Sequence, residues 1–182
     1  MSDIIEYYAK SENGKYSEPL LAHLLKTLDN AEDLIEGYKI ASPELQQAIK
    51  IASAFHDIGK ADYRFQKYLI SNESKPIIFH PLLGLSVIDE IASSLGENIK
   101  SLIVLAVASH HTALHQDLYS QVEEDDESQT LQIKNIPYFE KIVCELINRI
   151  GIDPIDVANC FSKRCMLVLR QAKYNFLPSC LI

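Results

Sequence analysis

Apolar positions recur along the chain at intervals of three and four residues, a spacing that predicts amphipathic helices. The pattern is clear over residues 17–37, which carry a leucine stripe, and again over residues 42–59. Serine is a favoured N-cap, so Ser17 and Ser42, each close to a proline tolerated in a first helical turn, predict where these helices begin. Glycine commonly ends a helix, so the second helix is predicted to end near Gly59.

Five further helices are predicted from the same periodicity, at Asp62–Leu69, Pro81–Leu95, Ile99–Ala108, Pro137–Ile150 and Pro154–Ala172. The segment Ile99–Ala108 is so apolar that we expect it to be buried on all sides. Residues 112–136 contain an acidic run at 123–127 and are expected to form a solvated loop. Neither an internal repeat nor an alternating strand pattern is visible. The predicted fold class is therefore all-α, a bundle of about six to seven helices.

The amino-acid composition agrees with this predicted fold and limits the possible number of domains, location and partners. The 182 residues fit one domain over 1–182, and a hydrophobic content of 47% is ordinary for a globular protein. No stretch of 18 apolar residues predicts a membrane span, and the N-terminus does not resemble a signal peptide, so we expect a cytoplasmic protein without a membrane partner. A net charge of −8 argues against tight, non-specific binding of duplex DNA but does not exclude a nuclease whose metals supply positive charge.

The cysteines lie toward the C-terminal end of the chain, at Cys144, Cys160, Cys165 and Cys180. None forms a CxxC pair, so the ligand spacing of a zinc finger is absent. We expect reduced core thiols, with a Cys160–Cys165 disulfide as the alternative.

The positions of the histidines are the most informative feature of the sequence. The six are His23, His56, His80, His110, His111 and His115. A single histidine in an apolar segment is usually an ordinary core or surface residue. His115 lies past the tandem pair His110-His111, and we assign it to the loop. Five in separate positions of a bundle are harder to explain by packing, because a buried imidazole is costly without partners. Metal coordination would give several of them partners at once.

Asp57 follows His56 directly, at the predicted end of a helix. Adjacent helical residues point about 100° apart, so the two side chains can reach one metal from different directions. The carboxylate can also bridge two metals through its two oxygens. A site rich in nitrogen and oxygen suits Mn, Fe, Ni, Co or Zn, whereas Mg prefers more oxygen ligands.

The segment HDIGK resembles the signature of the HD superfamily. The order H…HD…H…HH over roughly residues 15–175 is similar to the two-metal branch of that superfamily, and most of all to the HD nuclease of type I CRISPR interference. The longer stretches HDIGKADYRFQKYL and FHPLLGLSVI are similar to the same family. In that family the domain is fused to a helicase or made as a separate small subunit.

The resemblance implies a site with two divalent metals, among Mg, Mn, Ni, Co or Fe. The first would be held by His23, His56 and Asp57, and the second by Asp57, His80, His110 and His111. Asp57 and Lys60 would be the catalytic residues, with Lys60 contacting the substrate phosphate beside the metals.

Lys60, Arg64 and Lys67 share one face if the segment is a helix. They are either a strip that follows a nucleic-acid backbone, with Tyr63 and Phe65 nearby for stacking, or an ordinary solvated face.

One feature departs from the family pattern. The family usually supplies a further aspartate from the final helix, where this chain reads LVLRQAKYNFL and has Lys173. Asp153 and Asp156 lie about one helix earlier and have no assigned place in the site. A water or Asn175 could stand in, or the first metal could bind weakly.

Three functions are compatible with these residues. The first is a single-stranded DNA nuclease of CRISPR interference that acts with a separate helicase and an RNA-guided surveillance complex, since the sequence has no GxxxxGK[ST] loop. The second is an HD phosphohydrolase of small nucleotides. The third is an adaptor that keeps the fold without full catalysis.

Overall fold

The computed structural model describes residues 6–12, 15–71, 79–111, 130–153 and 155. The elements are β1 (Tyr8–Glu12), β2 (Lys15–Pro19), α1 (Leu20–Gly37), α2 (Pro43–Phe55), the 3-10 helix η1 (Ile58–Ala61), α3 (Tyr63–Ser71), α4 (His80–Leu83), α5 (Leu85–Ile91), the 3-10 helix η2 (Ala92–Ser94), α6 (Glu97–Ala108) and α7 (Ile136–Ile150).

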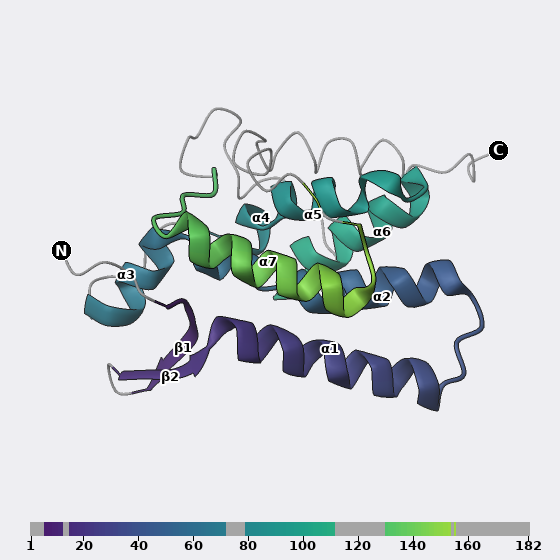
Figure 1. Cartoon of the computed structure of the whole chain (residues 1–182), viewed down its shortest axis with the longest axis horizontal. Helices are drawn as coiled ribbons and strands as arrows, with labels where there is room; N and C mark the ends of the chain where they lie inside the picture. The colour runs from purple at the N-terminus through teal and green to yellow at the C-terminus, as the bar shows by residue number, and fades with distance from the viewer. Residues whose placement is uncertain (1–5, 13–14, 72–78, 112–129, 154, 156–182) are drawn as a thin grey trace.

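The helices form a bundle around α2, which packs against α1, α5, α6 and α7 (Figure 1). In this view α1 runs along the lower edge, α7 crosses in front of α2, and α4, α5 and α6 lie above. The predicted all-α helical bundle is confirmed, with one small two-stranded sheet added to it.

That sheet is a β-hairpin at the start of α1, which the sequence analysis did not predict. β1 and β2 are antiparallel, and Lys10 lies opposite Glu18 in their register. Residues 17–19 therefore belong to a strand, and the first turn of α1 begins at Leu20 with Pro19 as its N-cap. The prediction that Ser17 caps this helix was wrong, because pairing with β1 holds the segment extended.

The second helix begins as predicted and ends earlier. The Ser42 hydroxyl accepts a hydrogen bond from the backbone N–H of Leu45 (3.2 Å), which confirms it as the N-cap. The α-helix ends at Phe55, His56 is its C-cap, and the chain tightens into η1 after Asp57.

The predicted helix Pro81–Leu95 is divided into α4, α5 and η2, and α4 packs closely against η1. A Cβ atom at Gly59 would overlap the carbonyl oxygen of His80, and one at Gly84 would lie 2.8 Å from the Ile58 side chain. Two glycines thus let η1 and α4 meet backbone to backbone, which positions Asp57 close to His80.

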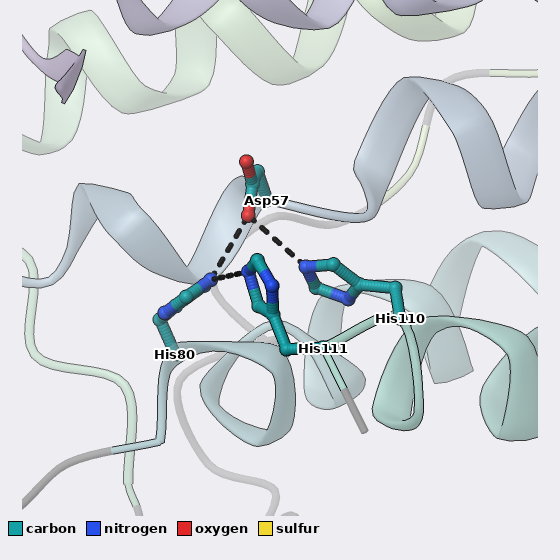
Figure 2. A group of neighbouring side chains, drawn as sticks. All are labelled: Asp57, His80, His110 and His111. Atoms are coloured by element: carbon teal, nitrogen blue, oxygen red, sulfur yellow. Dashed lines mark hydrogen bonds and ion pairs between the residues drawn. The ribbon is translucent and has the colours of Figure 1, made fainter. Parts of the chain in front are cut away.

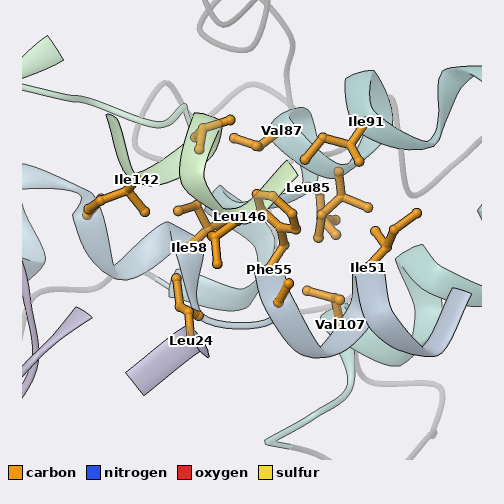
Figure 3. Close-up of a cluster of buried hydrophobic side chains, with 14 of the residues drawn as sticks. Leu24, Ile51, Phe55, Ile58, Leu85, Val87, Ile91, Val107, Ile142 and Leu146 are labelled. Carbon is orange, nitrogen blue, oxygen red and sulfur yellow. The ribbon is translucent and has the colours of Figure 1, made fainter. Parts of the chain in front are cut away.

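A continuous core lies between the helices (Figure 3). Ile51 and Phe55 of α2 are both fully buried, and Phe55 sits at its centre, so truncating Phe55 to alanine would cost about 3–5 kcal/mol. α6 presents only part of its surface to this core, because Leu102 is 39% exposed and Ala106 is exposed too. The expectation that the apolar segment Ile99–Ala108 is buried on all sides was wrong.

α7 begins where predicted, within one residue. The Asn135 side chain accepts from the Tyr138 N–H (3.2 Å) and caps its first turn, and Gly151 ends it with a positive φ of 72°. Cys144 on this helix is an exposed free thiol, not the core thiol that was expected. No helix in the part of the chain described here is both long and apolar enough to cross a bilayer.

Several predictions fall on residues outside the described ranges. They concern the helix Pro154–Ala172, the loop at 112–129, Cys160, Cys165, Cys180, His115, Asp156, Lys173 and Asn175.

Candidate metal centre

Five histidines from separate parts of the fold converge on Asp57. His23 comes from α1, His56 caps α2, His80 begins α4, and the tandem pair follows α6. The last of these, His110 and His111, reach the site together with His80, as Figure 2 shows. The convergence that the sequence pattern predicts is therefore present.

The first group consists of His23, His56 and Asp57, whose ligand atoms lie within 4.8 Å of one another. The Nε2 atoms of His23 and His56 lie 2.9 and 3.2 Å from the same carboxylate oxygen, Asp57 Oδ2. Their rings are 5.3 Å apart, centroid to centroid. Two imidazole nitrogens and one carboxylate oxygen thus surround one point.

The second group lies on the other oxygen of the same carboxylate (Figure 2). The Nε2 atoms of His80 and His110 lie 3.0 and 3.3 Å from Asp57 Oδ1. The Nε2 atom of His111 lies 3.1 Å from that of His80, and the four ligand atoms are within 4.8 Å of one another. His111 is the exposed member, so the group is open to solvent on its side.

Asp57 itself is 2% exposed. Burial acts to raise the pKa of its carboxyl, but the close contacts with the four surrounding imidazoles outweigh burial and hold this pKa far below its ordinary value. The Lys60 ammonium adds a contact of 2.7 Å to Oδ2. Asp57 is therefore a carboxylate anion available to bridge two cations.

The hydrogen-bond partners of the His56 and His110 rings indicate which ring nitrogen carries the hydrogen, and so whether the site suits metal ions. The Nδ1 atoms of His56 and His110 lie 2.9 and 2.6 Å from the carbonyl oxygens of Ser53 and Val107. A carbonyl only accepts, so Nδ1 carries the hydrogen, and in a neutral ring Nε2 presents a lone pair to the Asp57 carboxylate. Two facing acceptors repel each other unless a cation lies between them, so the donor set fits divalent metals.

The imidazole rings of His80 and His111 are also held in the neutral form. Burial lowers the pKa of His80, despite the opposing effect of Asp57. Burial, together with the charges of His110 and His80, lowers the pKa of His111 to about 4. Neutral imidazoles are the form that binds metals, so these two side chains are ready as ligands near neutral pH.

Glu18 belongs to the site although the sequence analysis did not select it. Its Oε2 atom lies 3.2 Å from His23 Nδ1 and 3.3 Å from Lys10 Nζ. Burial acts to raise the pKa of Glu18, but Lys10 and His23 lower it overall. The only signal in the sequence is its place five residues before His23, which means little until the hairpin is known.

The three basic residues predicted to share one helix face are separated in the structure. Lys60 lies in η1, next to Asp57, whereas Arg64 and Lys67 lie on α3. The Arg64 guanidinium donates to the buried Asp62 carboxylate (2.9 and 2.8 Å) and to the Thr130 carbonyl (3.0 Å). Lys67 is exposed, and contacts of Arg64 and Lys67 with a substrate stay predictions.

Phe65 supports the site instead of offering an open stacking surface. It is 9% exposed, its ring lies 5.3 Å from the His80 ring, and Lys60 Nζ lies 5.9 Å from its centroid. Tyr63, the other predicted stacking residue, lies under the Lys134 ammonium at 4.9 Å. Phe65 therefore packs behind a candidate ligand and a candidate phosphate contact at once.

Comparison with known proteins gives a family and one relative. The family described as HD domain matches residues 20–148, a span that contains every candidate metal ligand. The carboxy-S-adenosyl-L-methionine synthase of Sulfurimonas denitrificans is 29% identical over 175 residues, which cover 85% of this chain and 69% of that protein. The synthase activity in that name belongs to the Sulfurimonas denitrificans protein and is not assigned to this chain. No solved structure matches the chain.

Proposed function

The chain belongs to the HD domain family, and from this premise we propose that it is a metal-dependent nuclease that hydrolyses phosphodiester bonds of single-stranded DNA. The proposal rests on how the two oxygens of the Asp57 carboxylate are shared between histidines. Oδ2 faces His23 and His56, whereas Oδ1 faces His80 and His110. A carboxylate shared in this way suits a pair of metals about 3.5–4 Å apart.

The residues of the site have separate roles in this proposal. His23, His56 and Asp57 would hold one divalent ion, and Asp57, His80, His110 and His111 the other. When bound, the two ions supply Lewis-acid activation of water and stabilisation of the leaving oxygen in an in-line displacement.

Asp57 sets the spacing of the two positions and offsets part of their charge. Lys60 is placed to contact a phosphate oxygen, because its ammonium already lies beside the carboxylate, with Phe65 packed behind it. The exposure of His111 leaves the second group open on the side from which a strand could approach.

The choice of single-stranded DNA rests on the resemblance of HDIGKADYRFQKYL, FHPLLGLSVI and the tandem histidines to the HD nuclease of type I CRISPR interference. On the same ground the proposed partners are a separate helicase and an RNA-guided surveillance complex. The place of the tandem pair supports the two-metal site, because both histidines belong to the second group.

The test is to incubate metal-stripped protein with labelled single-stranded DNA, single-stranded RNA and mononucleotides, adding Mg, Mn, Ni or Co in turn. We expect cleavage of single-stranded DNA that a chelator abolishes, with duplex DNA resistant. Release of phosphate from mononucleotides without DNA cleavage would instead assign the chain to the phosphohydrolases of small nucleotides.

A further inference from the structure

The N-terminal hairpin reaches the metal centre from outside the span that matches the HD domain. That span begins at Leu20, whereas Glu18 and its cross-strand neighbour Lys10 lie before it. Glu18 nevertheless contacts the ring of His23, a candidate ligand of the first metal, at 3.2 Å. The hairpin therefore adds a carboxylate to a site whose candidate ligands all come from the matched span.

The contact determines which nitrogen of His23 faces the metal position. An ionised carboxylate only accepts hydrogen bonds, so His23 Nδ1 donates to Glu18 and the Nε2 lone pair of a neutral ring points at Asp57 Oδ2, 2.9 Å away. A carboxylate on the outer nitrogen also makes the inner nitrogen a more basic ligand.

His56 and His110 use the same arrangement with a different acceptor. Their Nδ1 atoms donate to the backbone carbonyls of Ser53 and Val107, three residues earlier in each case. His23 lies near the start of its helix, and its Nδ1 turns to a side chain on the preceding strand. The orientation of His23 thus depends on a residue that can be mutated without changing the backbone.

The hairpin is held in a defined place, so Glu18 is not simply a mobile surface charge. The side chain of Gln66 accepts from the Tyr8 N–H (3.0 Å) and donates to the Tyr8 carbonyl (2.8 Å) and to the Lys60 carbonyl (2.7 Å). Lys10 holds Glu18 from the opposite strand at 3.3 Å. The carboxylate is therefore presented to His23 by a hairpin whose β1 strand is linked to η1 through Gln66 of α3.

We propose that Glu18 is a positioning residue that orients His23 and selectively strengthens metal binding at the first position. The inference rests on the proposed two-metal site and adds a residue that the family match does not contain. Loss of a partner of this kind typically weakens metal binding by about 10- to 100-fold. The second position, formed by Asp57, His80, His110 and His111, should not change.

The test is a titration of the metal-stripped full chain with Co²⁺, followed by calorimetry and visible absorption. The wild type should bind two equivalents, and His23→Ala and His111→Ala identify the first and second positions. Glu18→Ala should weaken the first position by about 10- to 100-fold and leave the second unchanged. Glu18→Gln should lose less, because its amide oxygen still accepts from Nδ1, and it serves if Glu18→Ala does not fold.

Two controls separate orientation of His23 from a general disturbance. In a His23→Ala background, Glu18→Ala should have no further effect, since the two changes remove one interaction. Glu32→Ala, which removes another ion-paired carboxylate, on α1, should leave both positions intact. Unchanged Co²⁺ affinity in Glu18→Ala, or equal loss at both positions, would overturn the inference alone. Absence of Co²⁺ binding by the wild type would overturn the proposed function as well.

Discussion

The backbone of Gly59 lies against that of His80 so closely that a Cβ atom at position 59 would overlap the His80 carbonyl oxygen. The two residues belong to η1 and α4, and their approach brings His80 Nε2 to 3.0 Å from Asp57 Oδ1. The glycine of the HDIGK segment is thus required by packing, and it does not end the preceding helix, which stops at Phe55.

Gly59→Ala should therefore both destabilise the fold and disturb the second metal position. Overpacking at a buried backbone contact costs about 1–3 kcal/mol, and relief of the overlap must move His80. Denaturant unfolding of the metal-stripped protein measures the first effect, and Co²⁺ titration the second. Gly37→Ala is the matched control, because nothing lies within 4 Å of a Cβ there. A Gly59→Ala protein with wild-type stability would contradict this account of the glycine.

Arg64 offers a prediction that separates structure from substrate binding. Its guanidinium is bound to Asp62, which is 0% exposed, so Arg64→Ala leaves a buried charge without its ion-pair partner. We expect the free energy of unfolding to fall by about 3 kcal/mol. Lys67→Ala, which removes an exposed side chain of α3, should change it by no more than about 1 kcal/mol. An Arg64→Ala protein that keeps full stability but loses affinity for single-stranded DNA would make Arg64 a substrate contact.

The pairing of Glu32 with Arg149 and Lys50 predicts a dependence of stability on pH. The hydrogen bond from Arg149 is the main cause that lowers the pKa of Glu32 below 4.5, despite the opposing effect of burial. A lowered pKa means that the pair stabilises the fold above pH 4.5 and that this contribution is lost as the pH falls through the lower, folded-state pKa.

Glu32→Gln should accordingly reduce the free energy of unfolding near pH 7 by no more than about 1 kcal/mol. The difference from the wild type should shrink as the pH falls below 4.5 and the unmutated side chain becomes protonated. Denaturant unfolding at a series of pH values measures it, with Glu36→Gln, an exposed glutamate on the same helix, as the control. A difference that grows on acidification would mean that Glu32 does not stabilise the fold through its charge.

The sequence was sufficient for the bundle and for the convergence of the histidines, because helical periodicity and an unusual set of polar residues in apolar segments are local signals. It was not sufficient for Glu18, whose role depends on a hairpin formed by two short strands with no alternating pattern. The role of Gly59 was also hidden, since the backbone of His80 that it meets lies 21 residues further along the chain. Tertiary contact decides both cases.

Asp57 is the residue on which both metal positions depend, and it supports the sharpest prediction. Asp57→Ala removes one ligand atom from each group, so binding at both positions should weaken and metal-dependent cleavage should fall to background. Lys60→Ala removes a single cation beside the site and should lower the rate of cleavage by about 100-fold, the usual effect of losing one oriented group that stabilises a developing charge. His115→Ala, outside both groups by the sequence argument, should have little effect.

Cleavage of labelled single-stranded DNA with Mn²⁺ present compares the three variants with the wild type, and circular dichroism checks that each retains its helices. The test is the order of the cleavage rates. Asp57→Ala must lower the rate more than Lys60→Ala does, because a bridging carboxylate serves two metals whereas Lys60 makes only one phosphate contact. Cleavage by Asp57→Ala at close to the wild-type rate would show that the chemistry lies elsewhere in the chain or in a contaminant. Equal losses in Asp57→Ala and Lys60→Ala would mean that the ammonium of Lys60 does more than contact the phosphate.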